Sequence, residues 1–238
     1  MMSFDTRVID IIDRAPGVKS FRFADADGFV FRPGQFFFVG ISVNGREAVK
    51  HFSFSNSPTE KGYVEFTKRL TGSDFSKALA GLKQGDAVRI KGPLGNFIYE
   101  GVPRKSAFLS GGIGITPIRS IFKYIVDRGI SSDAVLLYGN NTLSDIIFKK
   151  DLDRIAQSGK GLKIVYTLTS AGDEGLGVWR GRTGFINSGM IKEEMPDYAE
   201  RVFYLCGPPA MVSGLRKILI DRMSLPEGRI IKEDFTGY

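Results

Sequence analysis

Hydrophobic and polar residues follow two different patterns along the chain. Through the first hundred residues, short β-rich runs are separated by Gly- and Pro-containing turns, and apolar–polar alternation is clearest around Phe21 to Phe23. Beyond about residue 102, apolar runs such as AVLLYG and LKIVYTLT stand between segments with helical spacing, such as TPIRSIFKYIVDRG. The first pattern is typical of an antiparallel barrel or sandwich, and the second of a parallel sheet with crossover helices. We therefore predict a β domain over 1–101 and an α/β domain over 102–238.

One helix is expected inside the β domain, over residues 73–82, where Ser73 has the residue type and position of an N-cap. Its N-terminus, in the segment TGSDFSKAL, presents backbone N–H groups to which a phosphate can bind.

Composition limits the chemistry. Cys206 and His51 are the single cysteine and the single histidine of the sequence, which excludes an internal disulfide, an all-cysteine cluster and a multi-histidine metal centre. Any redox chemistry therefore needs a bound organic cofactor. No apolar run of about 18 residues and no secretory signal pattern is present, so we expect a cytoplasmic protein without a membrane span.

The net charge is +7. No basic run with interleaved aromatic residues accompanies it, so nucleic-acid binding is not expected. An anionic cofactor or an acidic protein partner suits this charge better.

The segment AFLSGGIGITP, residues 107–117, predicts a strand, a glycine turn and the start of a helix. Glycines allow a tight turn and a close approach of backbone to a ligand, and the helix N-terminus favours an anion. The spacing is Gly112-x-Gly114-x-x-Pro117, which differs from the Gly-x-Gly-x-x-Gly dinucleotide fingerprint. Taken alone, the segment leaves a nucleotide site and a plain strand-to-helix turn both open.

A second strand end, YLCGPPAM at residues 204–211, places Cys206 directly before a glycine and two prolines. Ligands of an open parallel sheet gather at the carboxyl ends of its strands. A free cysteine alone is more often a buried apolar residue, but the neighbouring glycine and prolines favour a site.

In the β domain, KHFSFSNSP at residues 50–58 offers a cation, aromatic rings and hydroxyls on an alternating strand. Alternation places Lys50 and Phe52 on one face and His51 and Ser53 on the other. An ordinary half-buried strand explains this segment equally well when it is taken alone.

Six motifs in order make the chain resemble the ferredoxin–NADP reductase family. They are RPGQF (32–36), KHFSFSNSP (50–58), GPLGNF (92–97), SGGIGITP (110–117), YLCGPPAM (204–211) and EDFTGY (233–238). The resemblance covers nearly the whole chain. It implies a β + α/β fold, with an N-terminal antiparallel flavin-binding β-barrel followed by a parallel-sheet α/β nicotinamide-nucleotide domain.

By this resemblance, KHFS stands where the family has an Arg-x-Tyr-Ser flavin motif. Ser53 would then hydrogen-bond near flavin N5, Phe52 would flank the flavin, and Lys50 would face its phosphate. Lysine in place of arginine loses the bidentate fork, and phenylalanine in place of tyrosine loses a hydroxyl. The implied cofactor is FAD, with FMN as the alternative. The implied flavin-binding residues are Lys50, His51, Phe52, Ser53, Thr67, Lys68, Ser73, Phe75 and Ser76.

The resemblance also assigns the second domain. The implied nucleotide-binding residues are Gly112, Gly114, Thr116, Pro117, Cys206, Gly207 and Pro208. Apart from the resemblance, the segment 167–182 offers Arg180 and Arg182 for a 2′-phosphate, which favours NADPH over the alternative NADH, although solvated loop arginines are the more common explanation of such residues. The terminal Tyr238 would stack on the isoalloxazine, and the implied catalytic residues are Ser53, Cys206, Glu233 and Tyr238. Glu233 or Asp234 would relay a proton.

The implied function is electron transfer from NAD(P)H through FAD to a one-electron carrier. An acidic carrier such as ferredoxin or flavodoxin suits the positive net charge. Three alternatives stay open: a free-standing flavin or ferric-chelate reductase, an electron-transfer subunit of a larger redox complex, and a ligand-binding module without turnover.

Overall fold

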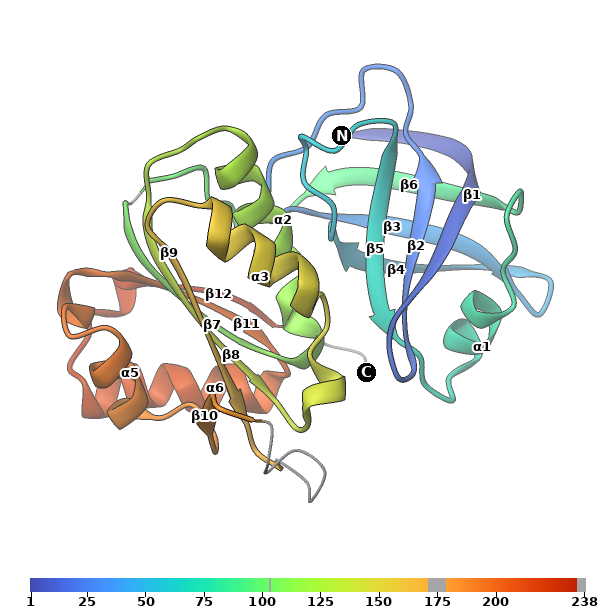
Figure 1. Ribbon diagram of the computed structural model, residues 1–238. Helices are drawn as coiled ribbons and strands as arrows, with labels where there is room; N and C mark the ends of the chain where they lie inside the picture. The colour runs from blue at the N-terminus through green and yellow to red at the C-terminus, as the bar shows by residue number, and fades with distance from the viewer. Residues whose placement is uncertain (103, 171–178, 235–238) are drawn as a thin grey trace. The chain divides into compact units, whose positions relative to one another are not determined.

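The computed structural model describes residues 1–102, 104–170 and 179–234. The chain forms two compact units, each with its own sheet (Figure 1). One unit comprises Met1–Glu100 with Thr116–Tyr124, and the other comprises Gly101–Ile115 with the chain from Ile125 onward. One sheet is antiparallel and the other parallel, so the predicted fold class is confirmed. Among the described residues, no helix has the length and apolar character needed to cross a bilayer.

The first unit is a half-barrel of six antiparallel strands in the order β4-β3-β6-β1-β2-β5. Its elements are β1 (Met2–Ala15), β2 (Val18–Ala24), β3 (Phe36–Val43), β4 (Arg46–Ser53), β5 (Tyr63–Arg69), α1 (Asp74–Ala80) and β6 (Ala87–Leu94). Between β3 and β4, Asn44 and Gly45 have φ values of 51° and 77°. Positive φ at both positions is what a two-residue hairpin turn requires, and Asn-Gly adopts it readily.

The core of this unit is rich in phenylalanine. Phe37 and Phe54 stack with their ring centroids 4.4 Å apart, and Phe52 stacks on Phe66 at 4.1 Å. Helix α1 adds Phe75 to this core. Its N-cap is Ser73, as predicted: the side chain accepts a hydrogen bond from the backbone N–H of Ser76.

One carboxylate lies inside this unit. Glu65 of β5 is 1% exposed. Its oxygens accept hydrogen bonds from Arg14 Nη2 at 3.0 Å, Arg22 Nε at 2.7 Å and Ser55 Oγ at 2.7 Å. A buried carboxylate is tolerated when cations and hydroxyls satisfy it in this way.

The second unit holds a six-stranded parallel sheet in the order β10-β9-β8-β7-β11-β12. Its strands are β7 (Lys105–Gly111), β8 (Asp133–Asn140), β9 (Leu162–Leu168), β10 (Arg182–Thr183), β11 (Val202–Gly207) and β12 (Ile230–Asp234). Its α-helices are α3 (Lys149–Ser158), α5 (Ser188–Glu194) and α6 (Pro209–Lys217), and α2 (Ile115–Asp127) is shared between the units. The short 3₁₀ helices are η1 (Gly112–Gly114), η2 (Leu143–Asp145), η3 (Tyr198–Glu200) and η5 (Glu227–Arg229), and η4 (Ile218–Arg222) is a π-helix that follows α6.

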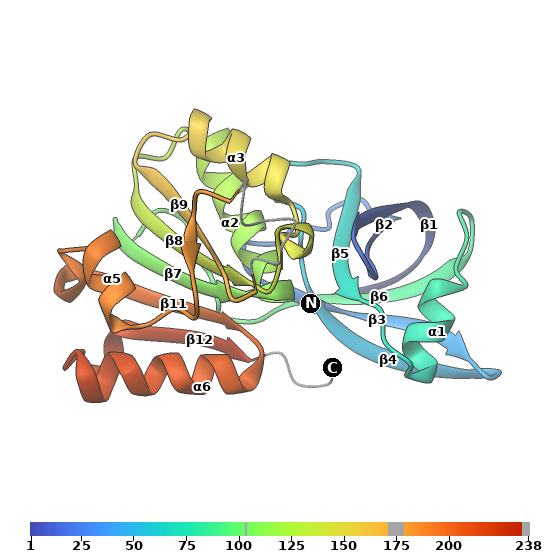
Figure 2. The same cartoon turned by 60° about the horizontal axis from the view of Figure 1, so that its bottom comes forward.

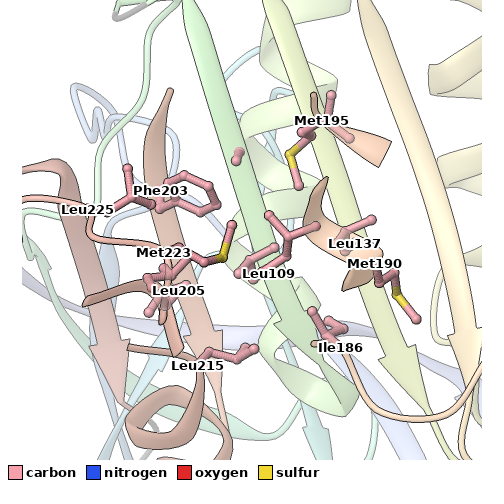
Figure 3. Close-up of a cluster of buried hydrophobic side chains, with 14 of the residues drawn as sticks. Leu109, Leu137, Ile186, Met190, Met195, Phe203, Leu205, Leu215, Met223 and Leu225 are labelled. Carbon is pink, nitrogen blue, oxygen red and sulfur yellow. The ribbon is translucent and has the colours of Figure 1, made fainter. Parts of the chain in front are cut away.

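Helices cover both faces of the parallel sheet: α5 and α6 lie on one face and α3 on the other (Figure 2). Leu109, Leu137 and Leu205 come from adjacent strands and form the centre of a buried apolar cluster (Figure 3). Met190 of α5 and Leu215 of α6 pack onto them. Because both faces are covered, the strands are apolar runs rather than alternating ones.

Arg201 ties together the amino ends of three strands of this sheet. Its guanidinium, 5% exposed, donates to Ser106 O at 3.2 Å and to Asp133 O at 3.0 Å. It also pairs with the carboxylates of Asp133 at 2.9 Å and Asp197 at 2.7 Å. Burial acts to raise the pKa of Asp197, but hydrogen bonds from Arg201 and Lys105 outweigh it and lower that pKa below 3.8.

We expect Arg201→Met to destabilise the second unit by about 3 kcal/mol or more, because it takes the buried cation from Asp133 and leaves two backbone carbonyls without their donor. The measurement is the free energy of unfolding from urea titration. Arg216→Met is the matched control, since that side chain is 38% exposed and pairs with an exposed Glu227. It should change stability by less than about 1 kcal/mol. Equal losses in the two variants would contradict the assignment.

Candidate active site

The two glycine-containing strand ends lie side by side at one edge of the parallel sheet. Strand β7 has β8 on one side and β11 on the other, so the order of the strands reverses at this point. Such a reversal opens a crevice at the carboxyl ends of the strands, where ligands of this sheet type bind. Gly111 ends β7 and Gly207 ends β11. Two motifs that are far apart in the sequence therefore end side by side at the carboxyl edge of the sheet.

Glycine is required in the turn η1 for two different reasons. A Cβ on Gly114 would lie 2.3 Å from the carbonyl oxygen of Cys206, so only glycine permits this approach. Gly112 has open space around it but a φ of 52°, which favours glycine. The Tyr138 hydroxyl donates to the carbonyl of Gly112 at 2.8 Å and holds the turn from the neighbouring strand.

Cys206 lies in register with Ser110 of β7 and with Glu233 of β12. Side chains at paired positions of adjacent parallel strands share one face of the sheet. Cys206 and Ser110 are both fully buried. The structure thus brings together two of the predicted catalytic residues, Cys206 and Glu233, and adds Ser110 beside them. We call these three residues the reactive row.

Two buried polar side chains, one in the reactive row and one at the end of β8, have no hydrogen-bond partner among the residues that the structure describes. They are the Ser110 hydroxyl and the Asn140 amide, the latter through both its nitrogen and its oxygen. Asn140 is only 6% exposed and ends β8. Because buried polar groups are nearly always paired, these atoms fit a polar ligand at the carboxyl edge, such as a nicotinamide nucleotide.

The other predicted nucleotide-binding residues lie in different elements and differ in their exposure and partners. Thr116 and Pro117 lie in the first turn of α2, and Pro208 is the N-cap residue of α6. Arg180 is exposed, whereas Arg182 is paired with Glu193 and with Glu194, whose Oε1 lies 2.6 Å from Arg182 Nε. The charge of Arg182 is therefore already balanced. Tyr238 lies outside the described residues.

In the first unit, Lys50 of β4 and Lys68 of β5 form a like-charged pair. Lys68 is 7% exposed. Burial and the charge of Lys50 both lower the pKa of the Lys68 ammonium. Two amines that repel each other in a partly buried place fit an anion between them. A flavin phosphate meets this requirement.

The residues around this lysine pair agree with a flavin site. The Phe52 ring lies on the same face of β4 as Lys50, stacks on Phe66, and has its centroid 6.0 Å from that of Phe75 in α1. Ser73 and Ser76 hold the turn at the start of α1: Ser73 Oγ accepts from the Ser76 N–H at 3.3 Å. The Ser76 hydroxyl is buried and accepts from the Thr71 N–H at 2.7 Å.

Two predicted flavin residues lie away from this group. His51 is exposed on the opposite face of β4, where its ring contacts Phe36 and Phe38. Thr67 is buried, and its hydroxyl lies 2.6 Å from Ser20 Oγ and 3.0 Å from Ser55 Oγ. Thr67 thus takes part in a polar network inside the unit. Ser53, 3% exposed, is the last residue of β4.

Comparison with known proteins identifies the family. Residues 7–99 match the oxidoreductase FAD-binding domain, and residues 108–217 match the oxidoreductase NAD-binding domain. The chain belongs to the ferredoxin–NADP reductase family. It therefore carries an FAD-binding and an NAD-binding domain, and the cofactors expected from the sequence are confirmed.

Solved structures of this family share the whole fold. The cytochrome P450 reductase GcoB of Amycolatopsis superposes with a TM-score of 0.83 at 27% identity, over 99% of this chain and 71% of that one. The ferredoxin NADP+ reductase of Neisseria gonorrhoeae gives a TM-score of 0.80 at 19% identity, over 98% of this chain and 99% of the other.

Curated relatives in the family are reductases with different partners. NADH-cytochrome b5 reductase 1 of Mortierella alpina is 32% identical over 90% of this chain and 73% of its own length. The enzyme of the same name from Pyricularia oryzae is 34% identical over 77% of this chain, and the match spans 62% of the relative. The glycine betaine monooxygenase reductase subunit of Pseudomonas aeruginosa is 30% identical over 90% of this chain and 59% of its length.

Sequence reasoning did not single out three residues at or near the carboxyl ends of these strands. Ser110 is the last residue but one of β7 and Asn140 is the last of β8. A polar residue directly after an apolar run is the signal that would have found them. Phe185 follows β10 and is 79% exposed, although an aromatic ring of this size is usually covered. A planar base could stack on such a ring.

We expect Gly114→Ala to weaken nucleotide binding and to destabilise the second unit by about 2 kcal/mol, because its methyl group would overlap the backbone of Cys206. Gly112→Ala is the matched control: it meets only the strain of a positive φ and should cost about 1 kcal/mol. Calorimetric titration with NADH and thermal unfolding measure both effects. Equal behaviour of the two variants would show that the close approach is unimportant.

Proposed function

We propose that this protein is a reductase that passes electrons from NAD(P)H through FAD to an electron carrier protein. The observation that carries this proposal is the reactive row beside the glycine turn η1, in a chain that also has an FAD-binding domain. When bound, FAD accepts two electrons from a nicotinamide and releases them singly.

In the second unit, the chain's own residues bind and orient the nucleotide. The N–H groups of the turn η1 would face its phosphates, and the amide of Asn140 supplies a donor and an acceptor without a partner among the described residues. Cys206 and Ser110 would border the nicotinamide, with the Glu233 carboxyl in register beside them to relay a proton. Tyr238 keeps the role expected from the family resemblance.

In the first unit, Lys50 and Lys68 bind the FAD phosphates, Phe52 lies against the flavin ring, and Ser53 hydrogen-bonds to it. The repulsion between the two lysines supports this assignment, because an anion between them removes an unfavourable interaction. Lys50 supplies charge without the fixed fork of the arginine that it replaces.

The acceptor we propose is an acidic one-electron carrier protein, with ferredoxin or flavodoxin as first candidates. The net charge of +7 supports electrostatic attraction of such a partner. A cytochrome is a further candidate from the names of the b5 reductase relatives, and service to an oxygenase is a second candidate function from the name of the Pseudomonas relative.

We propose NADH as the preferred donor, in place of the NADPH that two arginines favoured. Arg182 is occupied by Glu193 and Glu194, which would repel a 2′-phosphate. Arg180 alone supplies less charge for that group. The names of the b5 reductase relatives point the same way.

The FAD-loaded protein should lose its visible flavin absorbance when mixed anaerobically with NADH, and NADPH should need about tenfold more nucleotide for the same effect. Added ferredoxin, flavodoxin or cytochrome b5 should restore the absorbance, at a rate that falls as salt rises. Turnover with free flavin but with none of these carriers would instead indicate a free-standing flavin reductase. A salt-independent rate would contradict electrostatic attraction of the carrier.

As the pH is raised, FAD affinity should begin to fall at a lower pH than it would if Lys68 had the pKa of an ordinary lysine. The pKa of Lys68 lies below 10.5, so its ammonium loses its proton, and its attraction for phosphate, as the pH rises through that lowered value. Fluorescence titration of the apoprotein with FAD between neutral and alkaline pH measures this. Lys68→Gln should bind FAD about tenfold more weakly and lose most of the pH dependence. Lys61→Gln, at an exposed position, is the control.

A further inference from the structure

The segment that follows Ser53 leaves β4 and crosses to β5. The N–H of Phe54 donates to Gln35 O at 3.0 Å, and the N–H of Ser55 donates to Glu65 O at 2.8 Å. The Asn56 side chain continues this pairing: its Oδ1 accepts from the Glu65 N–H at 2.9 Å, and its Nδ2 donates to Tyr63 O at 2.9 Å. The position of this crossing fixes where β4, and therefore Ser53, ends.

Two consecutive residues of α2 hold two consecutive carbonyls of this segment. Arg119 Nη1 donates to Ser55 O at 3.1 Å, and Ser120 Oγ donates to Asn56 O at 2.7 Å. Arg119 is 5% exposed and Ser120 is fully buried. Both contacts lie inside the first unit, to which Thr116–Tyr124 belongs.

Glu60 fixes the arginine from the other side. Its carboxylate accepts from Arg119 Nη2 at 3.0 Å and from the Ser57 N–H at 2.7 Å, and it also contacts Arg119 Nη1. A buried ion pair offsets its desolvation only when the geometry is good and the remaining donors are used. Here the guanidinium meets both demands by binding a carboxylate and a backbone carbonyl together. The arginine is therefore held in one orientation.

We propose that Arg119 and Ser120 are positioning residues for the flavin. They act through the carbonyls of Ser55 and Asn56, which fix the end of β4 and so the place of the Ser53 hydroxyl and the Phe52 ring. This inference rests on the proposed function, because it takes Ser53 and Phe52 as flavin contacts. A guanidinium suits the task better than an ammonium, since its planar fork reaches two acceptors in set directions.

The test compares Arg119→Met, Arg119→Lys and Ser120→Ala with Arg201→Met as the matched control. Arg201 is also a buried arginine that binds carboxylates and backbone carbonyls, but it lies in the other unit. Two measurements use the apoprotein: the dissociation constant of FAD, and amide hydrogen exchange at Phe54 and Ser55. A third uses the loaded protein: kcat and KM for NADH.

Arg119→Met should raise the dissociation constant of FAD about tenfold and speed exchange at Phe54 and Ser55 by a similar factor, as expected for losing a hydrogen bond to a charged group. It should lower kcat while KM for NADH stays unchanged. Arg119→Lys should recover part of each effect, and Ser120→Ala should show changes of about threefold. Arg201→Met should lower the unfolding temperature and leave all of these values as in the unchanged protein.

The inference is overturned if Arg119→Met and Ser120→Ala reduce stability alone, with FAD affinity and exchange at Phe54 and Ser55 unchanged. Should Arg119→Met fail to fold, Ser120→Ala and Arg119→Lys decide the question by the same measurements. Failure of the proposed function is separate: the unchanged protein would then bind FAD without being reduced by NADH. The exchange and FAD titrations would still report on the two positioning residues.

Discussion

The lack of a side chain at Gly114 is the constraint on which the nucleotide site depends. A Cβ there would lie 2.3 Å from the Cys206 carbonyl oxygen, so the turn after β7 sits directly against the end of β11. This approach brings the N–H groups of the turn next to the reactive row. The same close contact explains why the motif has glycine at position 114. The motif closes on Pro117 rather than on a third glycine because Gly114 already leaves the space that the approach of the two backbones needs.

Buried arginines perform the same structural task in both units. Arg119 and Arg201 each bind carboxylates and backbone carbonyls at the ends of strands. In each case the carboxylates balance the charge of the arginine, and the hydrogen bonds to the carbonyls fix the course of the backbone. Glu65 shows the opposite arrangement: one carboxylate accepts hydrogen bonds from two arginines and from the Ser55 hydroxyl. A lysine at these positions would supply the positive charge but would not fix the directions of the hydrogen bonds, because its ammonium lacks a planar fork.

Much of the fold could be predicted because it depends on local patterns. Apolar alternation, the Asn44-Gly45 turn and the Ser73 cap each act over a few residues, and six ordered motifs pointed to the family.

The candidate site was predictable only in part. Arg182 was assigned to a 2′-phosphate, but helix α5 brings Glu193 and Glu194 to it, and no local sequence pattern indicates such a contact. Likewise Arg119 meets Glu60, which is 59 positions away, so only the folded chain shows the pair. The short strand β10 and strand β12 were also missed, because each adds to the edge of a sheet whose register is set by strands elsewhere in the sequence.

The strand order of the parallel sheet separates two kinds of residue. The reactive row stands on β7, β11 and β12, on one side of the sheet's centre, whereas Arg182 and the exposed Phe185 belong to the β10 edge on the other. No residue of β10 is therefore paired in register with Cys206. On the function proposed above, substitutions at that edge would alter the choice of nucleotide while the residues of the reactive row are inherited unchanged. Such independence is a reason why one fold supports so many reductases.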